Sequence, residues 1–261
     1  MQLVAYGAQD IYLTGNPQIT FFKIVYRRHT NFAMESVEQT LDGTADFGNS
    51  VSANISRNGD LVGRMYVEAS MSSISNPNAN IGSALLSEII LEIGGQQIDK
   101  HYGHWLETWA LLTEPNTSMI ATSMVGPNHT VGTKFQNMSL MGAVGGEDKG
   151  GISAINKIFI PLQFSFNRNP GLALPLIALQ YHEVKIKIQF GAAADISSGS
   201  PSLSASLWAD YIYLDTDERR RFAQVSHEYL IEQLQYISSG LGTSHDITFN
   251  HPVKELIWTG G

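Results

Sequence analysis

Three runs of alternating residues constrain the fold of this chain most strongly. They span residues 51–56, 64–71 and 183–190, and apolar side chains occupy every second position in each. A period of two turns one face of a strand toward a core and the other toward water or a neighbour. The three runs therefore predict half-buried β-strands.

Turn chemistry and size agree with a β-sandwich. The pairs Asp42-Gly43, Asn58-Gly59 and Gly94-Gly95 lie beside or between apolar runs, as tight turns require. The 261 residues, 43% of them hydrophobic, suffice for one large β domain or two smaller ones. We expect an all-β, antiparallel sandwich.

One helix and two loops interrupt this pattern. A helix is predicted over residues 99–113, with Asp99 as its N-cap and Pro115 after its end. Residues 114–151 and 191–202 are interpreted as loops, the longer one on the outer surface. Beyond residue 225, two segments, 227–237 and 244–258, are predicted to be further strands.

Composition excludes several classes of chemistry. The chain has no cysteine, which rules out disulfides, thiol nucleophiles and cysteine-based zinc sites. Neither a signal peptide nor an apolar run of about 18 residues is apparent. The net charge of −8 argues against broad binding to nucleic acid.

No catalytic motif stands out. His101, His104 and Glu107 are spaced i, i+3 and i+6, which on a helix could hold a metal. A solvated polar face is the favoured interpretation, and the His-x-His pair of cupin enzymes is absent. There is no G-x-S-x-G elbow and no phosphate-binding G-x-x-x-x-G-K-[ST] loop. We therefore predict no enzyme activity, no cofactor and no metal.

The N-terminal segment, residues 2–34, is unusual. After Asp10 no acidic residue occurs until Glu35, and an aromatic, cationic run lies between them. Its candidate contact residues are Phe21, Phe22, Lys23, Tyr26, Arg27 and Arg28. Two interpretations of the charge stay open: strand-edge charge that meets acids of the same fold, or docking to an anionic membrane or a second protein.

Several segments resemble the major capsid proteins of nucleocytoplasmic large DNA viruses, of the phycodnavirus, iridovirus and mimivirus type. Besides the N-terminal segment, they are LEIGGQQIDKHYGHWLETW (91–109), FIPLQFSFNRNPGLALPLIALQYHEVKI (159–186), DYIYLDTDERRRFAQ (210–224) and FNHPVKELIW (249–258). The resemblance implies two consecutive jelly rolls, of which this chain holds the first and the start of the second. The expected divisions are an arm (1–30), the first jelly roll (31–224) and an incomplete second one (225–261).

The resemblance also implies a function. Three such subunits would form a pseudo-hexagonal capsomer, and capsomers would tile an icosahedral shell assembled in the host cytoplasm. The expected partners are other copies of the chain, neighbouring capsomers, minor capsid proteins and an inner viral membrane, without direct contact to nucleic acid. The alternatives are a jelly-roll carbohydrate-binding module and, less favoured, a cupin-like metalloenzyme.

Glycosylation sequons form the last set of candidate sites. Those in the long loop are at Asn116, Asn128 and Asn137, and a fourth is at Asn54. Polar loop composition is the favoured explanation, because secretory glycosylation needs a signal peptide. The resemblance leaves open that these asparagines carry sugars.

Overall fold

The computed structural model describes residues 29–74, 77–115, 133–142, 157–240, 242 and 244–259, together with 7, 8, 12, 15, 16 and 20–23. The chain divides into two compact units, Met1–Asn31 and Phe32–Gly261. All helices and strands named below belong to the second unit.

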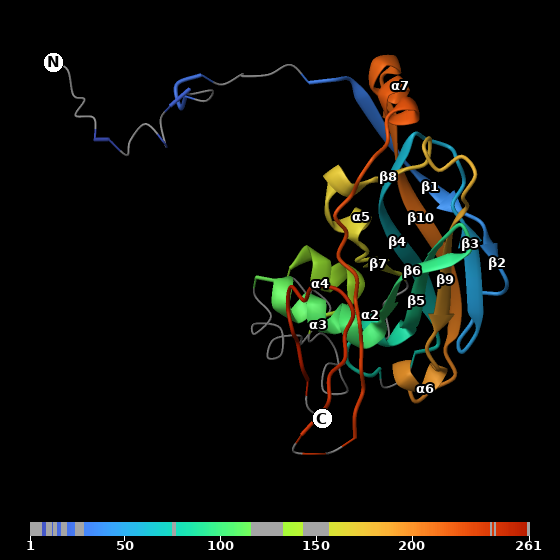
Figure 1. Ribbon diagram of the computed structural model, residues 1–261. Coiled ribbons are helices and arrows are strands. Elements are labelled where there is room, and N and C mark those ends of the chain that lie inside the picture. Colours follow the sequence, from blue (N-terminus) through green and yellow to red (C-terminus); the bar gives the residue numbers. More distant parts are fainter. Residues whose placement is uncertain are drawn as a thin grey trace. The chain divides into compact units, whose positions relative to one another are not determined.

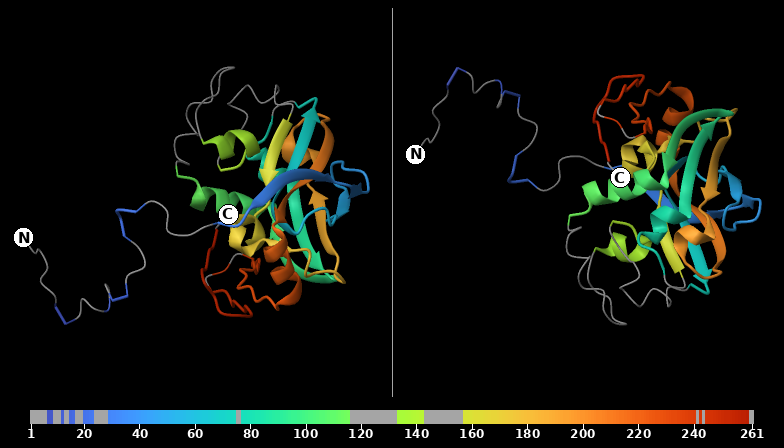
Figure 2. Two further views of the ribbon diagram at one scale, coloured as in Figure 1. Left: turned by 90° about the horizontal axis from the view of Figure 1, so that it is seen from above. Right: turned by 90° about the horizontal axis from the view of Figure 1, so that it is seen from below.

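The described residues of this unit contain ten strands. They are β1 (Phe32–Gln39), β2 (Leu41–Asp42), β3 (Ser50–Asn54), β4 (Leu61–Ser72), β5 (Leu86–Ile93), β6 (Gln96–Tyr102), β7 (Lys157–Pro161), β8 (Leu174–Pro175), β9 (Val184–Phe190) and β10 (Ser202–Leu214). One sheet has the order β1-β10-β4-β7 with β8 also paired to β4, and the other has the order β2-β3-β9-β5-β6. Every pairing is antiparallel. The two sheets face each other (Figures 1 and 2) as an antiparallel jelly-roll sandwich, which confirms the predicted fold class.

In the part of the unit that the structure describes, short helices and one 3₁₀ turn connect the strands. They are α2 (Ile81–Leu85), α3 (Gly103–Thr113), α4 (Lys134–Ser139), α5 (Ser165–Arg168), η3 (Pro170–Leu172), α6 (Ala193–Ile196) and α7 (Thr216–Gln224). Helices α2, α3 and α4 gather beside the sandwich (Figure 1). Among the described residues, no helix has the length and apolar character needed to cross a bilayer.

The alternating runs pack as predicted. In β9 every second side chain is buried, and in β4 the apolar members from Met65 to Met71 are buried while their neighbours are not. The buried apolar side chains of β3 and β9, and those of β4 from Val62 to Met71, belong to one core cluster. The two-residue period therefore identified the inward face of each strand correctly.

The Gly94-Gly95 turn closes a hairpin between β5 and β6. Ile93 pairs with Gln96, so the loop has two residues, and both glycines have positive φ, 61° and 79°. Two positive φ values define the type I′ turn that matches the twist of paired strands. From this turn the pairing of β5 with β6 continues to Glu88 and Tyr102.

The helix predicted over residues 99–113 begins at Gly103 and not at Asp99. Residues 99–102 instead complete β6, because the β5–β6 ladder extends to the pair Glu88–Tyr102. Asp99 does not cap the helix, and its side chain is buried in contact with His101. The helix ends at Thr113, as Pro115 indicated.

Both predicted loops contain a helix. Within 114–151, the described residues 133–142 contain α4, which Thr133 caps, and the following Leu140 and Met141 are part of the core. Within 191–202, α6 buries Ile196. The prediction that 114–151 is a structureless surface loop is thus wrong for residues 133–142. Their apolar residues are too few for periodicity to show.

The two strands predicted after residue 225 are also absent: the described residues of 225–259 contain no strand. The segments do meet, since the amide of Gln235 bonds the main chain of Asn250 in both directions, at 3.0 and 2.9 Å. These are side-chain bonds and not a ladder. Strand-forming residues do not suffice here, because no described strand pairs with these segments.

A buried polar network joins β1 to β10. Tyr211 is fully buried, and its Oη lies 2.6 Å from the carbonyl oxygen of Ser56 and 3.0 Å from Gln39 Oε1. Gln39 Oε1 also accepts a bond from Ser56 N, and Gln39 Nε2 donates to the Val37 carbonyl. Burial raises the pKa of the Tyr211 phenol to about 12, although the hydrogen bond to Gln39 acts in the opposite direction and lowers this pKa.

Candidate assembly surface

The most exposed strand of the sandwich is β1. It is the outermost strand of its sheet and pairs only with β10 among the described strands, with Phe32 opposite Leu214. Phe32 is 65% exposed and Met34 56%. An edge strand with exposed apolar side chains is a site for association with another chain.

A row of aromatic rings crosses the sheet beside β1. Trp208 of β10 stacks on Tyr66 of β4 with ring centroids 6.3 Å apart, and Tyr66 meets Phe159 of β7 edge to face at 6.1 Å. All three rings are half-buried. Burial raises the pKa of Tyr66, and the nearby Asp210 carboxylate adds to the effect. The row links three neighbouring strands, β10, β4 and β7, of the sheet whose edge is β1.

A second candidate surface lies where residues 226–259, here called the tail, pass over β6, α3 and α5 (Figure 1). Strand β6 is the edge of the other sheet. Gln233 Nε2 donates to the Ile98 carbonyl at 2.5 Å, and Leu234 N donates to Asp99 Oδ1 at 3.1 Å. The tail therefore satisfies polar groups of the β6 edge without extending the sheet.

The Asp99 carboxylate connects the tail to the core. Its other oxygen lies 3.0 Å from His101 Nε2, and both side chains are almost fully buried. The His101 ring stacks on Phe164 with centroids 4.5 Å apart. A buried carboxylate needs hydrogen-bond partners. His101 supplies one to Asp99 from within the sandwich, and the contact with Leu234 N depends on this preformed site.

Charged residues form a second set of contacts between the tail and the sandwich. Arg168 of α5 lies over the Trp109 ring, 4.7 Å from its centroid, and pairs with Glu232 at 3.2 Å. Lys254 also pairs with Glu232. The hydrogen bond from Lys254, together with the Arg168 charge, lowers the pKa of Glu232. Two parts of the tail thus converge on one carboxylate.

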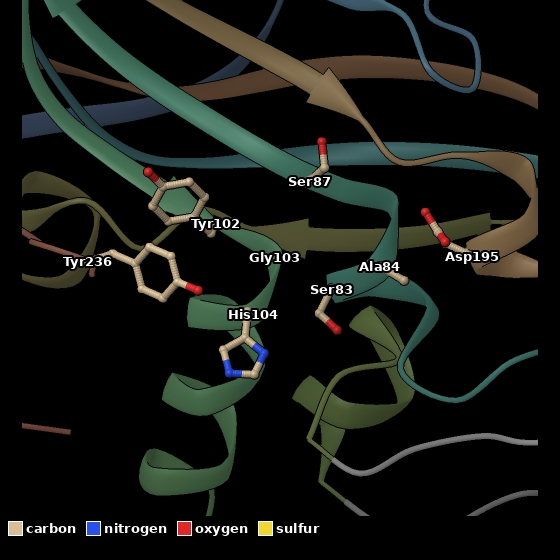
Figure 3. A pocket seen from close by; sticks show the side chains of 8 residues that line it. All are labelled: Ser83, Ala84, Ser87, Tyr102, Gly103, His104, Asp195 and Tyr236. Atoms are coloured by element: carbon tan, nitrogen blue, oxygen red, sulfur yellow. The ribbon is translucent and has the colours of Figure 1, made fainter. Parts of the chain in front are cut away.

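A cavity of about 340 Å³ marks one end of this junction (Figure 3). Its lining residues are Ser83, Ala84, Ser87, Tyr102, Gly103, His104, Asp195 and Tyr236. The Tyr102 and Tyr236 rings meet with centroids 5.1 Å apart, and His104 Nε2 lies 2.9 Å from Thr259 Oγ1. The hydroxyls of Ser83 and Ser87 bond main-chain carbonyls. These side chains already have partners, and they form part of the contact between the tail and the sandwich.

The three residues considered as metal ligands do not converge. His101 ends buried on β6, whereas His104 bonds Thr259. Both oxygens of Glu107 accept from Gly142 N at 3.0 Å. In the described part of the chain, no set of three potential ligands surrounds a common point. The favoured interpretation placed all three residues on one solvated face of a helix. It is wrong for His101, because that residue lies buried in strand β6.

The structure places only some of the predicted contact residues. Phe21 and Phe22 are 100% and 96% exposed, and Lys23 is exposed. Tyr26, Arg27 and Arg28 lie outside the described residues. Of the sequon asparagines, Asn137 is exposed on α4, whereas Asn116 and Asn128 lie outside the described residues.

Sequence reasoning missed Asp99, Arg168 and Glu232 as the residues that hold the tail. Asp99 was interpreted as a helix cap, and a lone arginine after two phenylalanines carries no pattern. The one available signal was Glu232 itself, an acid within the apolar run of 227–237.

A family profile described as "Major capsid protein N-terminus" matches residues 20–215. A major capsid protein of Pyramimonas orientalis virus is 56% identical over 266 residues, covering 99% of this chain and 64% of the relative. That of Paramecium bursaria Chlorella virus 1 is 47% identical, covering 98% of this chain and 59% of the relative.

A solved structure, "PBCV-1 virus capsid, quasi-atomic model", superposes with a TM-score of 0.68 at 42% identity. It covers 83% of this chain and 50% of that one. The chain thus spans half to two thirds of the length of the proteins it matches. The comparisons support neither a carbohydrate-binding module nor a cupin-like metalloenzyme.

Proposed function

Because the chain belongs to the major capsid protein family of large DNA viruses, we propose that it is a structural subunit of a virion shell. The observation that carries this proposal is the family match over residues 20–215, which spans the whole sandwich. The relatives are structural capsid proteins and not enzymes.

Three copies form a pseudo-hexagonal capsomer, and capsomers tile an icosahedral shell. The exposed apolar side chains of β1 support a role in contacts between copies, since such a strand is unfavourable in an isolated subunit. The partners are then copies of the chain and neighbouring capsomers. The site of action is the virion, assembled in the host cytoplasm.

The tail leads into a second jelly roll in the whole protein. This assigns residues 31–224 to the first domain and 225–261 to the start of the next. The contacts of Asp99 and Arg168 with the tail then fix the orientation of the second domain on the first.

The arm, residues 1–30, reaches toward inner components of the shell. Phe21 and Phe22 supply apolar contacts, and Lys23, Tyr26, Arg27 and Arg28 supply a cationic, aromatic surface. Minor capsid proteins and an anionic membrane are the partners that this chemistry fits. The net charge of −8 disfavours direct contact with nucleic acid.

Sedimentation of the full-length protein tests the central proposal. We expect a trimer whose subunit contacts each bury roughly 1,200–2,000 Å², the area of a stable specific interface. Electron microscopy of the same sample should show particles with a six-sided outline. A full-length protein that stays monomeric at all accessible concentrations would contradict the proposal.

A further inference from the structure

The pair Asn58-Gly59 lies in the connection between β3 and β4. It is the one asparagine–glycine pair in the chain, and it forms a bend outside any helix or strand. The Asn58 side chain is exposed to solvent. In the part of the chain that the structure describes, neither this side chain nor the Gly59 N–H makes a hydrogen bond. A reaction between these two groups therefore has no hydrogen bond to break.

Asparagine followed by glycine is open to such a reaction, and asparagine is among the thermally labile residues. The Gly59 nitrogen attacks Cγ of Asn58, a new C–N bond closes a succinimide ring, and the side-chain amide leaves as ammonia with the Gly59 proton. Water then opens the ring at one of its two carbonyl carbons, which yields aspartate or isoaspartate. Glycine favours the closure because its main chain rotates freely and it has no Cβ to obstruct the attack.

Packing against β10 requires glycine at position 59. A Cβ there would lie 2.9 Å from the Cβ and 3.1 Å from the Cδ1 of Tyr211. Because Tyr211 is fully buried in a close-packed interior, it has little room to move away. Any residue with a side chain, which would slow the ring closure, is therefore disfavoured at this position.

We propose that Asn58 deamidates spontaneously in the folded protein, so that modified copies accumulate as the protein ages. The reaction consumes one water and releases one ammonia, and it needs no enzyme. The inference goes beyond the proposed function, since assembly of a shell does not require it.

The isoaspartate product disturbs the attachment of α7 to the sandwich. Its main chain runs through the former side chain, which inserts one extra carbon directly before Gly59. The next residue, Asp60, is buried, and its carboxylate accepts from Leu214 N at 2.9 Å and pairs with Arg219 of α7 at 2.9 Å. Since Gly59 is tightly packed, the added length displaces Asp60 and weakens its contact with Arg219. Helix α7 directly precedes the tail, so the start of the tail loosens with it.

Peptide mapping of the full-length protein tests the site. The folded protein is incubated in mildly alkaline buffer at physiological temperature, and mass spectrometry follows the deamidation of each asparagine. Asn49 is the internal control: it is also exposed, but it precedes Ser50, and its side-chain amide donates to the Thr44 carbonyl at 3.3 Å. We expect Asn58 to react at least about tenfold faster than Asn49, equivalent to a barrier lower by about 1.4 kcal/mol. Equal rates at the two asparagines would overturn the proposal.

Hydrogen exchange of residues 216–224 measures the effect on α7. The isoaspartate form should exchange roughly two- to fivefold faster than fresh protein, the range for loss of a partly exposed ion pair. Asn58→Gln is the matched variant, because glutamine must close a larger and less favourable ring. Its exchange should be the same before and after incubation. Asn58→Asp, measured fresh, supplies the charge without the extra carbon and should leave α7 as protected as in the natural protein.

The two measurements separate the modification from its effect. Deamidation at Asn58 with unchanged exchange in α7 would support the site and overturn the link to Asp60. Faster exchange in fresh Asn58→Asp would overturn the argument from main-chain length, because the charge alone would then suffice. Loosening of α7 in incubated Asn58→Gln would show that the change in the aged protein has another origin.

Discussion

Replacement of Tyr211 by phenylalanine should change how the stability of the sandwich depends on pH. The Tyr211 hydroxyl is buried between Ser56 and Gln39, and its pKa is raised to about 12. The neutral phenol is thus favoured by the folded state. Below the unfolded pKa of about 10, this stabilisation is fully present.

The magnitude follows from the two pKa values. Between pH 10 and pH 12 the unfolded chain loses the Tyr211 proton more readily than the folded protein does, so stability falls as pH rises. A difference of about two pKa units corresponds to about 2.7 kcal/mol in total, and about half of it is lost by pH 11. The Tyr211→Phe variant escapes this loss. At neutral pH the variant should be less stable by about 1 kcal/mol, because the Ser56 carbonyl loses its donor.

Urea unfolding followed by tryptophan fluorescence measures both effects. The free energies of unfolding of the natural protein and of Tyr211→Phe should converge as pH rises and cross at about pH 11. Burial also raises the pKa of other phenols, including Tyr66 and Tyr229, but these are common to both proteins and cancel in the difference. A difference that stays constant from pH 7 to pH 11 would refute the reasoning, since Tyr211 would then titrate alike in both states.

Three further changes test the packing around the sandwich. Gly103→Ala would place a Cβ 2.1 Å from the Ser83 carbonyl oxygen and should lower the denaturation free energy by about 3 kcal/mol or more, whereas Gly63→Ala, with ordinary contacts, should change it by less than about 1 kcal/mol. Thr133→Ala removes the cap of α4 and should cost about 1 kcal/mol, read from hydrogen exchange in that helix. Arg168→Gln should speed proteolysis of the tail without lowering the melting temperature of the sandwich; equal cleavage would show that the ion pair is dispensable.

Strands β3, β4 and β9 were predictable because each carries its own signal. Alternation in β4 and β9 reports which side faces the core, and Gly94-Gly95 fixes a hairpin locally. The start of α3 was not predictable, since whether Asp99 belongs to a strand or a helix is decided by pairing with Leu91. Sequence spacing does not show such pairing.

The candidate assembly surface was harder to predict from the sequence than the fold. The exposure of β1 depends on its place at the edge of the sheet, which the residues of Phe32–Gln39 do not specify. The tail appeared to form strands because its residues favour them. Its structure is decided instead by long-range partners, with Asp99 and Arg168 as the main ones.

The sheet order has a consequence for how the chain is made. Each sheet receives an inner strand late in the sequence: β9 lies between β3 and β5, and β10 lies between β1 and β4. During synthesis the earlier strands must wait for these partners, and closing such long loops is slow. Until residues 202–214 have left the ribosome, β1 and β4 cannot complete their pairing with β10. The nascent chain therefore carries exposed strand edges until β10 has been synthesised, when protection by chaperones matters most.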